Sequence, residues 1–357
     1  MKITVKTSTF LGTVFTSAII WTFCLGFFYV FDYFGLYWNF DFRHNGSLNF
    51  SGIKHLLFHI LLGFVLGFLY GTVEFLSDKY LTKSLSLGKQ LILKIVVDLV
   101  ITVGILKLVA LDSFINKFHY STSSVTFDER FEIILLFMVF CSCLVIFLIK
   151  VANERFGKGV FAKILLGQYK TPKEEDRIFM FLDLKDSTTI AEILGHLKYS
   201  LFIQDCFYDL NTVVSKFEAE IYQYVGDEVV LTWPYAKGIT NNNCVALFFE
   251  FQQCQLSRGN YYQRNYGIYP RFKAGVHGGA LMIAQVGFVK KQLAFHGDVI
   301  NTSARIQKQC NNYNVPLLVS EKLIKDLKIP EHLKSTCLGD VLLKGKEKQV
   351  KVYSLLL

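Results

Sequence analysis

The chain has 357 residues, of which 52% are hydrophobic and 15% aromatic, with only five prolines. This composition excludes a disordered or fibrous protein, and the length allows two domains. The eight cysteines form neither a CxxC pair nor a zinc-finger spacing, which indicates free thiols in a reducing compartment. The formal charge of +9 comes from lysines beside apolar segments, so it favours a membrane protein over one that binds nucleic acid.

Four apolar segments occupy the first 150 residues. A helix needs roughly 20 apolar residues to cross a bilayer, and the segments cover 7–31, 55–76, 90–111 and 133–149. A signal peptide is the alternative for the first segment, but that stretch is too long and no small-residue cleavage site follows it. We therefore expect a transmembrane domain of four helices over residues 1–151.

Ionisable residues within these segments need partners. The third segment carries Lys94, Asp98 and Lys107, and the spacing of Lys94 and Asp98 places them one helical turn apart, where they can form an ion pair. His55 and His59 share a face of the second segment. Because no pair of histidines stands on another segment, we expect these two to face neighbouring helices or headgroups, with no metal or haem between them.

Basic residues are distributed unequally between the two sets of loops. Nine fall on one side of the expected membrane: Lys2, Lys6, Lys79, Lys83, Lys89, Lys150, Arg155, Lys158 and Lys163. Four fall on the other: Arg43, Lys54, Lys117 and Arg130. The basic excess predicts that both termini and everything after residue 150 are cytoplasmic, with the chain in the plasma (inner) membrane.

The remaining sequence mixes short helices and strands. Residues 152–172 suit a short coupling helix that ends before Pro172. The alternation beyond it predicts an α/β sandwich with a mostly antiparallel sheet over residues 173–357. Strands are expected at 177–184, 219–225, 228–233, 271–287 (as a pair), 292–297, 315–320, 338–344 and 348–355, and helices at 187–216, 243–256, 298–311 and from Glu321.

Two acids stand at strand ends. Asp183 closes the first strand in "FLDLKDSTT", and Asp227 occupies a hairpin turn after Gly226 in "YVGDE". If these strands are neighbours, both carboxylates emerge at one sheet edge, where hard oxygen ligands suit Mg²⁺ or Mn²⁺ held jointly with substrate phosphates. A helix cap for Asp183 and an ordinary turn for Asp227 are the alternatives. We expect Glu228 to be a solvent-facing turn residue.

An amide and several cations supply the opposite charge. Asn301 and Arg305 are four residues apart at the start of a helix and project from the same face, with Asp298 expected as the N-cap. This pair can hold a ribose and a transferring phosphoryl group, although Arg305 can also pair with a neighbouring acid. Lys273 and Lys344 follow later in the chain, and each alone is a surface lysine.

The ordered set of motifs is similar to a known family. An Asp-Leu-x-x-Ser-Thr after a strand precedes a Gly-Asp hairpin, a Gly-x-His-x-Gly, a Gly-Asp-x-x-Asn-x-x-x-Arg and a final Lys-Gly-Lys. Together they resemble the class III nucleotidyl cyclase catalytic domain over about residues 173–357. The resemblance implies a ferredoxin-like α/β fold with a mostly antiparallel sheet. It also implies a reaction in which the ribose 3′-oxygen attacks the α-phosphorus, giving a cyclic 3′,5′-nucleotide and pyrophosphate.

The resemblance also implies a role for each matching residue. Asp183 and Asp227 correspond to the aspartates that bind two Mg²⁺ or Mn²⁺ ions per site, with the Leu184 carbonyl as a further ligand. Asn301 corresponds to the ribose-orienting asparagine, and Arg305 to the arginine that stabilises the transition state.

Lys344 and Lys273 correspond to basic residues that contact the terminal phosphates. In this family the metal-binding aspartates of one subunit face the Asn and Arg of the other across a dimer interface. This chain carries both halves, so the resemblance implies a homodimer with two equivalent sites.

The purine-selecting positions depart from the family pattern. Adenylate-forming members typically have Lys, and guanylate-forming ones Glu, three residues before the hairpin Gly; this chain has Gln223. Seven residues before the Asn, the corresponding residues are Asp or Thr and Cys, and this chain has Ala294. Because a guanine edge is better gripped by Glu than by an amide that both donates and accepts, we expect ATP as the substrate.

The sequence thus predicts a membrane-bound adenylate cyclase gated through residues 152–172, with lipid, a membrane protein or a small molecule as possible regulators of the membrane domain. A guanylate cyclase and a catalytically silent receptor or scaffold remain alternatives. A diguanylate cyclase is disfavoured because Tyr224 and Val225 stand where its motif needs Gly. A transporter with a nucleotide-binding tail is disfavoured because the chain lacks a GxxxxGK[ST] loop.

Overall fold

The structure is a computed structural model that describes residues 2–33, 50–80, 85–119, 129–156, 160–289, 291–331, 333–342 and 349–357. It divides into two compact units, Met1–Phe156 and Gly157–Leu357. Each unit is described by itself.

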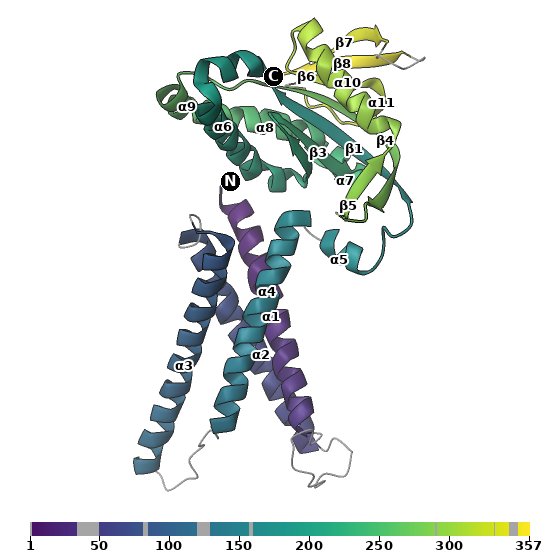
Figure 1. The fold of residues 1–357 in the computed structure, drawn as a ribbon. Coiled ribbons are helices and arrows are strands. Elements are labelled where there is room, and N and C mark those ends of the chain that lie inside the picture. Colours follow the sequence, from purple (N-terminus) through teal and green to yellow (C-terminus); the bar gives the residue numbers. More distant parts are fainter. Residues whose placement is uncertain are drawn as a thin grey trace. The chain divides into compact units, whose positions relative to one another are not determined.

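The first unit is helical. Its long helices are α1 (Lys2–Tyr33), α2 (Phe50–Tyr80), α3 (Leu87–His119) and α4 (Glu129–Phe156) (Figure 1). Among the described residues, three windows are long and apolar enough to cross a membrane: Phe10–Phe27, Leu56–Asp78 and Leu136–Asn153. The segment expected at 90–111 is helical and lies within α3, but it is not among these windows, and some of its side chains lie outside the described residues.

Helices α1 and α2 approach each other so closely that glycine is required. A Cβ atom placed on Gly67 would lie 2.4 Å from the Cα of Ala18, and one on Gly63 would lie 2.6 Å from the Cα of Thr22. The glycines recur every fourth residue of α2, so they form one stripe along the contact with α1. Such small-residue stripes are typical of helix packing in membranes, where dispersion contacts replace the hydrophobic effect.

Charged residues of the first unit lie between helices. Lys94 of α3 is 7% exposed, and its Nζ lies 2.7 Å from Glu74 and 3.0 Å from Asp78, both on α2. Lys150 of α4 lies 2.6 Å from Asp78. The expected ion pair between Lys94 and Asp98 is wrong, because Lys94 pairs with the acids of α2. Asp98 instead accepts a hydrogen bond of 2.7 Å from the thiol of Cys143.

Of the two histidines in the second apolar segment, the structure describes the side chain of His59. The ring of His59 contacts that of Tyr29 on α1, with 4.9 Å between centroids. The side chain of His55 lies outside the described residues. All eight cysteines of the chain are free.

The second unit is built on a mixed, mainly antiparallel sheet. The strand order is β2-β3-β1-β4-β6-β8-β7, with β5 paired to β4. Among the strand pairs of the described residues, β4 and β6 alone run parallel. The strands are β1 (Lys173–Leu184), β2 (Glu220–Val225), β3 (Glu228–Pro234), β4 (Phe272–Val286), β5 (Gln292–His296), β6 (Leu317–Ser320), β7 (Lys334–Val341) and β8 (Val350–Leu356).

Helices cover both faces of this sheet (Figure 1). They are α5 (Val160–Leu165), α6 (Ser187–Val214), α7 (Tyr235–Ile239), α8 (Asn243–Ser257), α9 (Gly259–Tyr266), α10 (Asp298–Tyr313) and α11 (Glu321–Ile324), with 3-10 helices η1 (Ser215–Phe217) and η2 (Thr240–Asn242). The sequence analysis did not predict α7 or α9. Helix α6 is kinked at Gly195.

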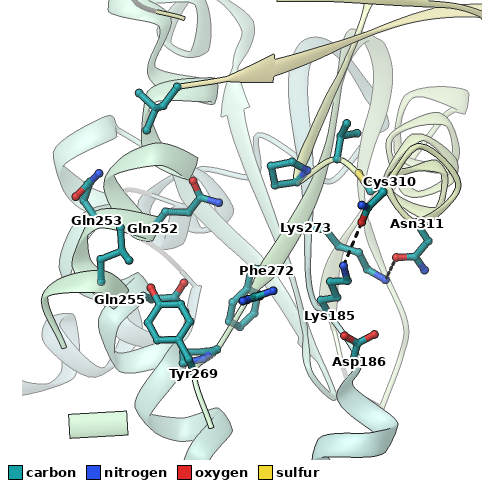
Figure 2. A pocket seen from close by; sticks show the side chains of 17 residues that line it. Lys185, Asp186, Gln252, Gln253, Gln255, Tyr269, Phe272, Lys273, Cys310 and Asn311 are labelled. Carbon is teal, nitrogen blue, oxygen red and sulfur yellow. Dashed lines mark hydrogen bonds between the residues drawn. The ribbon is translucent and has the colours of Figure 1, made fainter. Parts of the chain in front are cut away.

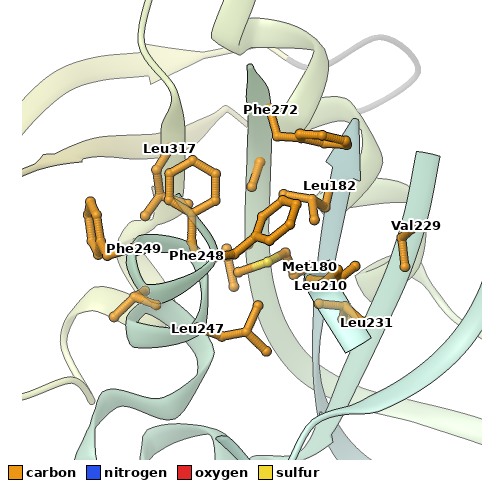
Figure 3. Packing of buried hydrophobic residues seen from close by; sticks show 14 of the residues in the cluster. Met180, Leu182, Leu210, Val229, Leu231, Leu247, Phe248, Phe249, Phe272 and Leu317 are labelled. Atoms are coloured by element: carbon orange, nitrogen blue, oxygen red, sulfur yellow. The ribbon is translucent and has the colours of Figure 1, made fainter. Parts of the chain in front are cut away.

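The alternation of β1 assigns its side chains to two layers. Met180 and Leu182 point into the larger core, where α6 and α8 contribute residues such as Leu210 and Phe248 (Figure 3). Phe179 and Phe181 point to the opposite face and pack with Val299 of α10. By the same two-residue period, Asp183 belongs to the face that α10 covers.

Strand β4 differs from the expected strand pair. Residues 272–286 form one continuous strand, although the glycines of "AGVHGGA" are typical of a turn. They instead allow close approach: a Cβ on Gly275 would lie 2.2 Å from the backbone nitrogen of Gln307, and one on Gly278 would lie 2.6 Å from the ring of Tyr235. Gly275 therefore lets α10 rest directly on the strand.

Candidate active site

Asp183 lies at the end of β1 between two strands. It pairs in register with Glu228 of β3 and Lys273 of β4. Its Oδ2 atom lies 3.1 Å from the ammonium of Lys273 and accepts a hydrogen bond of 2.9 Å from Gln307 Nε2 on α10. Burial raises the pKa of Asp183, and Asp227 raises it further, while Lys273 and Gln307 oppose the shift. The carboxylate is therefore held in place by a cation and an amide.

Asp227 lies in the two-residue turn between β2 and β3. Gly226 before it has a φ of 63°, which favours glycine. The turn places Asp227 beside Glu228 and within electrostatic range of Asp183. The expected neighbourhood of the two aspartates at one sheet edge is thus present in the structure.

Glu228 corrects an expectation. It is half-buried as the first residue of β3, not a solvent-facing turn residue. Its pKa is raised to about 7, chiefly by burial and then by the charges of Asp183 and Asp227. This edge of the sheet therefore concentrates three acids, which favours the binding of cations.

The donor set fits a hard divalent cation. Among the described residues, no group of three or more His, Cys, Asp or Glu is arranged to hold a metal by itself. Two carboxylates and the Leu184 carbonyl, in contrast, match the few protein ligands that Mg²⁺ accepts when water and phosphates complete its shell. Asp183 already faces one cation, the Lys273 ammonium, at 3.1 Å.

Helix α10 presents different residues on its two sides. Its buried side, which includes Ser303 and Gln307, faces the sheet. At 100° per residue, Asn301 and Arg305 lie roughly 120° and 160° around the helix from Gln307. Asn301 is exposed and Arg305 is half-buried. Within one chain, α10 thus directs Gln307 towards Asp183, whereas Asn301 and Arg305 lie on other sides of the helix and do not face Asp183.

The start of α10 differs slightly from expectation. Asp298 is the first helical residue, after Gly297 at the N-cap, and its carboxylate accepts a hydrogen bond of 3.2 Å from Thr302. The helix itself begins where the sequence predicted, so Asn301 and Arg305 lie in its first two turns.

Side chains of β2 and β5, the strands that carry Gln223 and Ala294, contact each other across one face of the sheet. The rings of Tyr222 on β2 and Phe295 on β5 contact each other at a centroid distance of 4.7 Å. Gln223 is exposed and Ala294 is half-buried. The structure therefore brings together the two strands that carry the purine-selecting positions.

A buried arginine that the sequence analysis missed holds these strands. Arg177 of β1 is 3% exposed, forms an ion pair with Glu220 of β2, and lies 5.3 Å from the ring centre of Phe295. In the sequence, the one feature that could have indicated its role is its position as a charged residue at the start of the expected apolar strand.

Two expected residues, Lys344 and Leu184, are still to be placed. Lys344 lies outside the described residues. Leu184 ends β1, and Asp186, two residues later, has a φ of 59° in the left-handed region. A non-glycine residue there is strained, which is common at functional loops. The turn from β1 into α6 is therefore sharply bent next to Asp183.

Comparison with known proteins agrees with this architecture. The family model for the adenylate and guanylate cyclase catalytic domain matches residues 170–356, more than half of the chain. A solved structure of a bacterial light-regulated adenylyl cyclase shares the fold, with a TM-score of 0.51 and 16% sequence identity over 58% of this chain and 59% of that one.

Two curated relatives are also similar. Adenylate cyclase 2 of Rhizobium meliloti (strain 1021) is 33% identical over 211 residues, which are 59% of this chain and 58% of that protein. Adenylate cyclase of Anabaena cylindrica is 22% identical over 49% of this chain and 35% of its own length. The chain thus spans little more than half of the first relative. Through residues 170–356 it belongs to the adenylate and guanylate cyclase catalytic domain family.

Proposed function

We propose that this protein is a membrane-bound adenylate cyclase that converts ATP to 3′,5′-cyclic AMP and pyrophosphate at a site shared by two copies of the chain. The observation that carries this proposal is the meeting of Asp183 and Asp227 at one sheet edge of a cyclase-family domain. The adenylate cyclase activity named for the Rhizobium meliloti relative supports the choice of reaction.

The residues of the edge have distinct roles in this proposal. Asp183, Asp227 and the Leu184 carbonyl hold the divalent cations, Mg²⁺ or Mn²⁺, two per site. When bound, these ions supply positive charge to the triphosphate and acidify the ribose 3′-hydroxyl. Lys273, which lies 3.1 Å from Asp183, contacts the terminal phosphates together with Lys344.

The other half of the site comes from α10 of a second copy. Asn301 orients the ribose, and Arg305 meets the negative charge that develops on the transferring phosphoryl group. The geometry of α10 supports this division, because the helix turns Gln307 to its own Asp183 and directs Asn301 and Arg305 roughly to the opposite side. A two-fold axis then makes two equivalent sites, and a single copy is inactive.

ATP is the proposed purine substrate. The side-chain amide of Gln223 can donate to the N1 position of adenine, whereas Ala294 provides no polar group. The same amide can pair with guanine, so the purine must be identified by product analysis.

The first unit is proposed to anchor the enzyme through four membrane-spanning helices over residues 1–151, with α3 as the third. Both termini and the catalytic domain, residues 173–357, are then cytoplasmic, because basic residues predominate in the loops on that side. Residues 152–172 connect the two domains. A regulator of the membrane domain, such as a lipid, a membrane protein or a small molecule, would act through this connection.

The test is direct product analysis. The purified full chain is incubated with ATP or GTP in the presence of Mn²⁺, and the products are separated by chromatography. Cyclic AMP that disappears in Asp227→Ala supports the proposal. Cyclic GMP alone would reverse the purine assignment, and no product from either nucleotide would favour a silent receptor or scaffold.

A further inference from the structure

Four apolar side chains of the second unit project into solvent at two places in the sequence. Leu165 and Leu166, at the end of α5, are 70% and 86% exposed. Phe288 and Val289, in the turn between β4 and β5, are 94% and 100% exposed. Three of the four exceed every other large apolar side chain that the structure describes. We call the four residues the apolar tip.

The two parts of the apolar tip lie at the same end of the second unit. The backbone N–H of Gln285, near the end of β4, donates a hydrogen bond of 3.0 Å to the carbonyl of Tyr169. Ile164 of α5 and Leu293 of β5 pack against the same buried cluster, which contains Ile283 of β4. Helix α5 therefore rests beside the β4–β5 hairpin (Figure 1). Exposed apolar surface gathered in this way marks a contact with a protein or a membrane.

The segments that carry the apolar tip are basic and contain no acid. Residues 155–173 include Arg155, Lys158, Lys163, Lys170 and Lys173, and residues 287–297 include Lys290 and Lys291, with no Asp or Glu in either stretch. Lys163, Lys170 and Lys291 are exposed. Apolar side chains flanked by lysines suit an anionic lipid surface, where the former enter the headgroup layer and the latter meet phosphates. Protein interfaces are instead depleted of lysine.

The covalent chain keeps the start of α5 close to a membrane-spanning segment. The window Leu136–Asn153 is long and apolar enough to cross a membrane, and the helix that contains it, α4, ends at Phe156. Helix α5 begins at Val160. Because consecutive Cα atoms are 3.8 Å apart, the four steps between these two residues span at most about 15 Å. This tether gives the apolar tip a high effective concentration of bilayer surface.

We propose that the apolar tip docks on the anionic surface of the bilayer that holds the first unit. The four apolar side chains enter the headgroup layer, and the flanking lysines contact lipid phosphates. Docking attaches the second unit to the membrane by a contact additional to the chain itself, and it restrains the β4–β5 hairpin. The proposal rests on the membrane anchoring proposed above and is independent of the cyclase reaction.

The test measures contact between the tip and lipid in the full chain. Val289→Cys is labelled with the fluorophore NBD in a Cys337→Ser background, which removes an exposed thiol. The protein is reconstituted into nanodiscs of phosphatidylcholine and phosphatidylserine, with or without lipids that carry a nitroxide near the headgroup. A side chain about 5–10 Å deep in this layer lies beside the nitroxides, so we expect the fluorescence to fall about twofold or more. Discs without phosphatidylserine should give weaker quenching.

Matched variants assign the contact to the tip. A label at Leu256→Cys reports on another apolar position, 58% exposed, in the pocket at the other end of β4 (Figure 2), and should not be quenched. With the label at position 289, Leu166→Asp should reduce the quenching to the level of that control. Lys291→Glu should reduce it only in discs that contain phosphatidylserine. Lys198→Glu, at an exposed position of α6, should leave it unchanged. Circular dichroism establishes that each variant is folded.

Three results would overturn the proposal. One is that lipid nitroxides leave the label at position 289 unquenched while its emission shifts to the blue, because a second copy of the chain then covers the tip. Another is that this label stays unquenched and its emission is that of a label in water. The third is equal quenching at positions 256 and 289. Flotation of the chain with lipid vesicles tests the anchoring, and product analysis tests the reaction, so failure of the docking is distinguishable from failure of the proposed function.

Discussion

The two units of this chain place polar and apolar residues in opposite ways. On α1, apolar side chains at every fourth position point away from the other helices; Phe15 is 63% exposed and Phe23 is 72% exposed. Ion pairs such as that of Lys94 with Glu74 are instead enclosed between helices. In the second unit large apolar side chains such as Phe202 and Phe248 are fully buried in the core, and acids gather at the sheet edge.

The difference indicates what surrounds each unit. An apolar exterior with an enclosed polar network is stable in a lipid environment, where charges must find partners inside the helix bundle. An apolar interior with an acidic edge is the arrangement expected in water. One structural device is common to both, because a glycine brings a helix onto the backbone of its neighbour at Gly67 and at Gly275.

The acidic edge should be the most sensitive position in either unit. Asp183→Asn removes a charge that the proposed metal site requires, so we expect the rate of cyclic nucleotide formation to fall about a thousandfold or more. The rate is measured on purified protein with saturating Mn²⁺ and ATP. Asp176→Asn alters an exposed aspartate near the other end of β1 and should keep nearly full activity. Equal activities of the two variants would contradict the site.

The enclosed charges of the first unit should respond next most strongly. Lys94→Met leaves Glu74, 10% exposed, without its closest cation, and breaking a buried pair in this way costs about 3–5 kcal/mol. We expect a corresponding fall in the free energy of unfolding of the full chain in detergent micelles, measured by denaturant titration. Lys107→Met, at an exposed position of the same helix, should unfold as the wild type does. A stable Lys94→Met would mean that the network is solvated.

The close approach at β4 should give a smaller loss. Gly275→Ala places a methyl group where the backbone of Gln307 lies 2.2 Å away, and such overpacking costs about 1–3 kcal/mol. Because α10 carries Asn301 and Arg305, activity should fall together with the melting temperature. Gly259→Ala, whose new methyl group would meet only ordinary contacts at 3.6 Å or more, serves as the matched variant. An unchanged melting temperature in Gly275→Ala would show that α10 does not rest on the strand.

Local patterns predicted the elements, and tertiary contacts decided the exceptions. The apolar run of β1, the Gly-Asp turn and the start of α10 at Asp298 are local features, so these elements and the positions of Asp183 and Asp227 followed from short stretches of sequence. The prediction of a strand pair in place of the single strand β4 was wrong for a physical reason that concerns its glycines. They serve approach by α10 and Tyr235, which come from elsewhere in the chain, and not a turn.

Partners distant in sequence were likewise beyond prediction. The one-turn spacing of Lys94 and Asp98 favoured an ion pair, but acids 16 and 20 residues before Lys94, Asp78 and Glu74, reach it across the helix interface. Glu228 became half-buried because β1 packs beside it. The repeat of glycines in α2 was readable as a helix-packing stripe, and its neighbours on α1 were not.

Mixing two inactive variants tests most directly whether each site is assembled from two copies. Asp183→Ala and Arg305→Ala are expressed together in equal amounts, and cyclic AMP formation is compared with that of each variant alone. Random pairing makes half of the dimers mixed, each with one intact site of two, so the account predicts about a quarter of wild-type activity. Activity no greater than that of the separate variants, in dimers verified to be mixed, would contradict it.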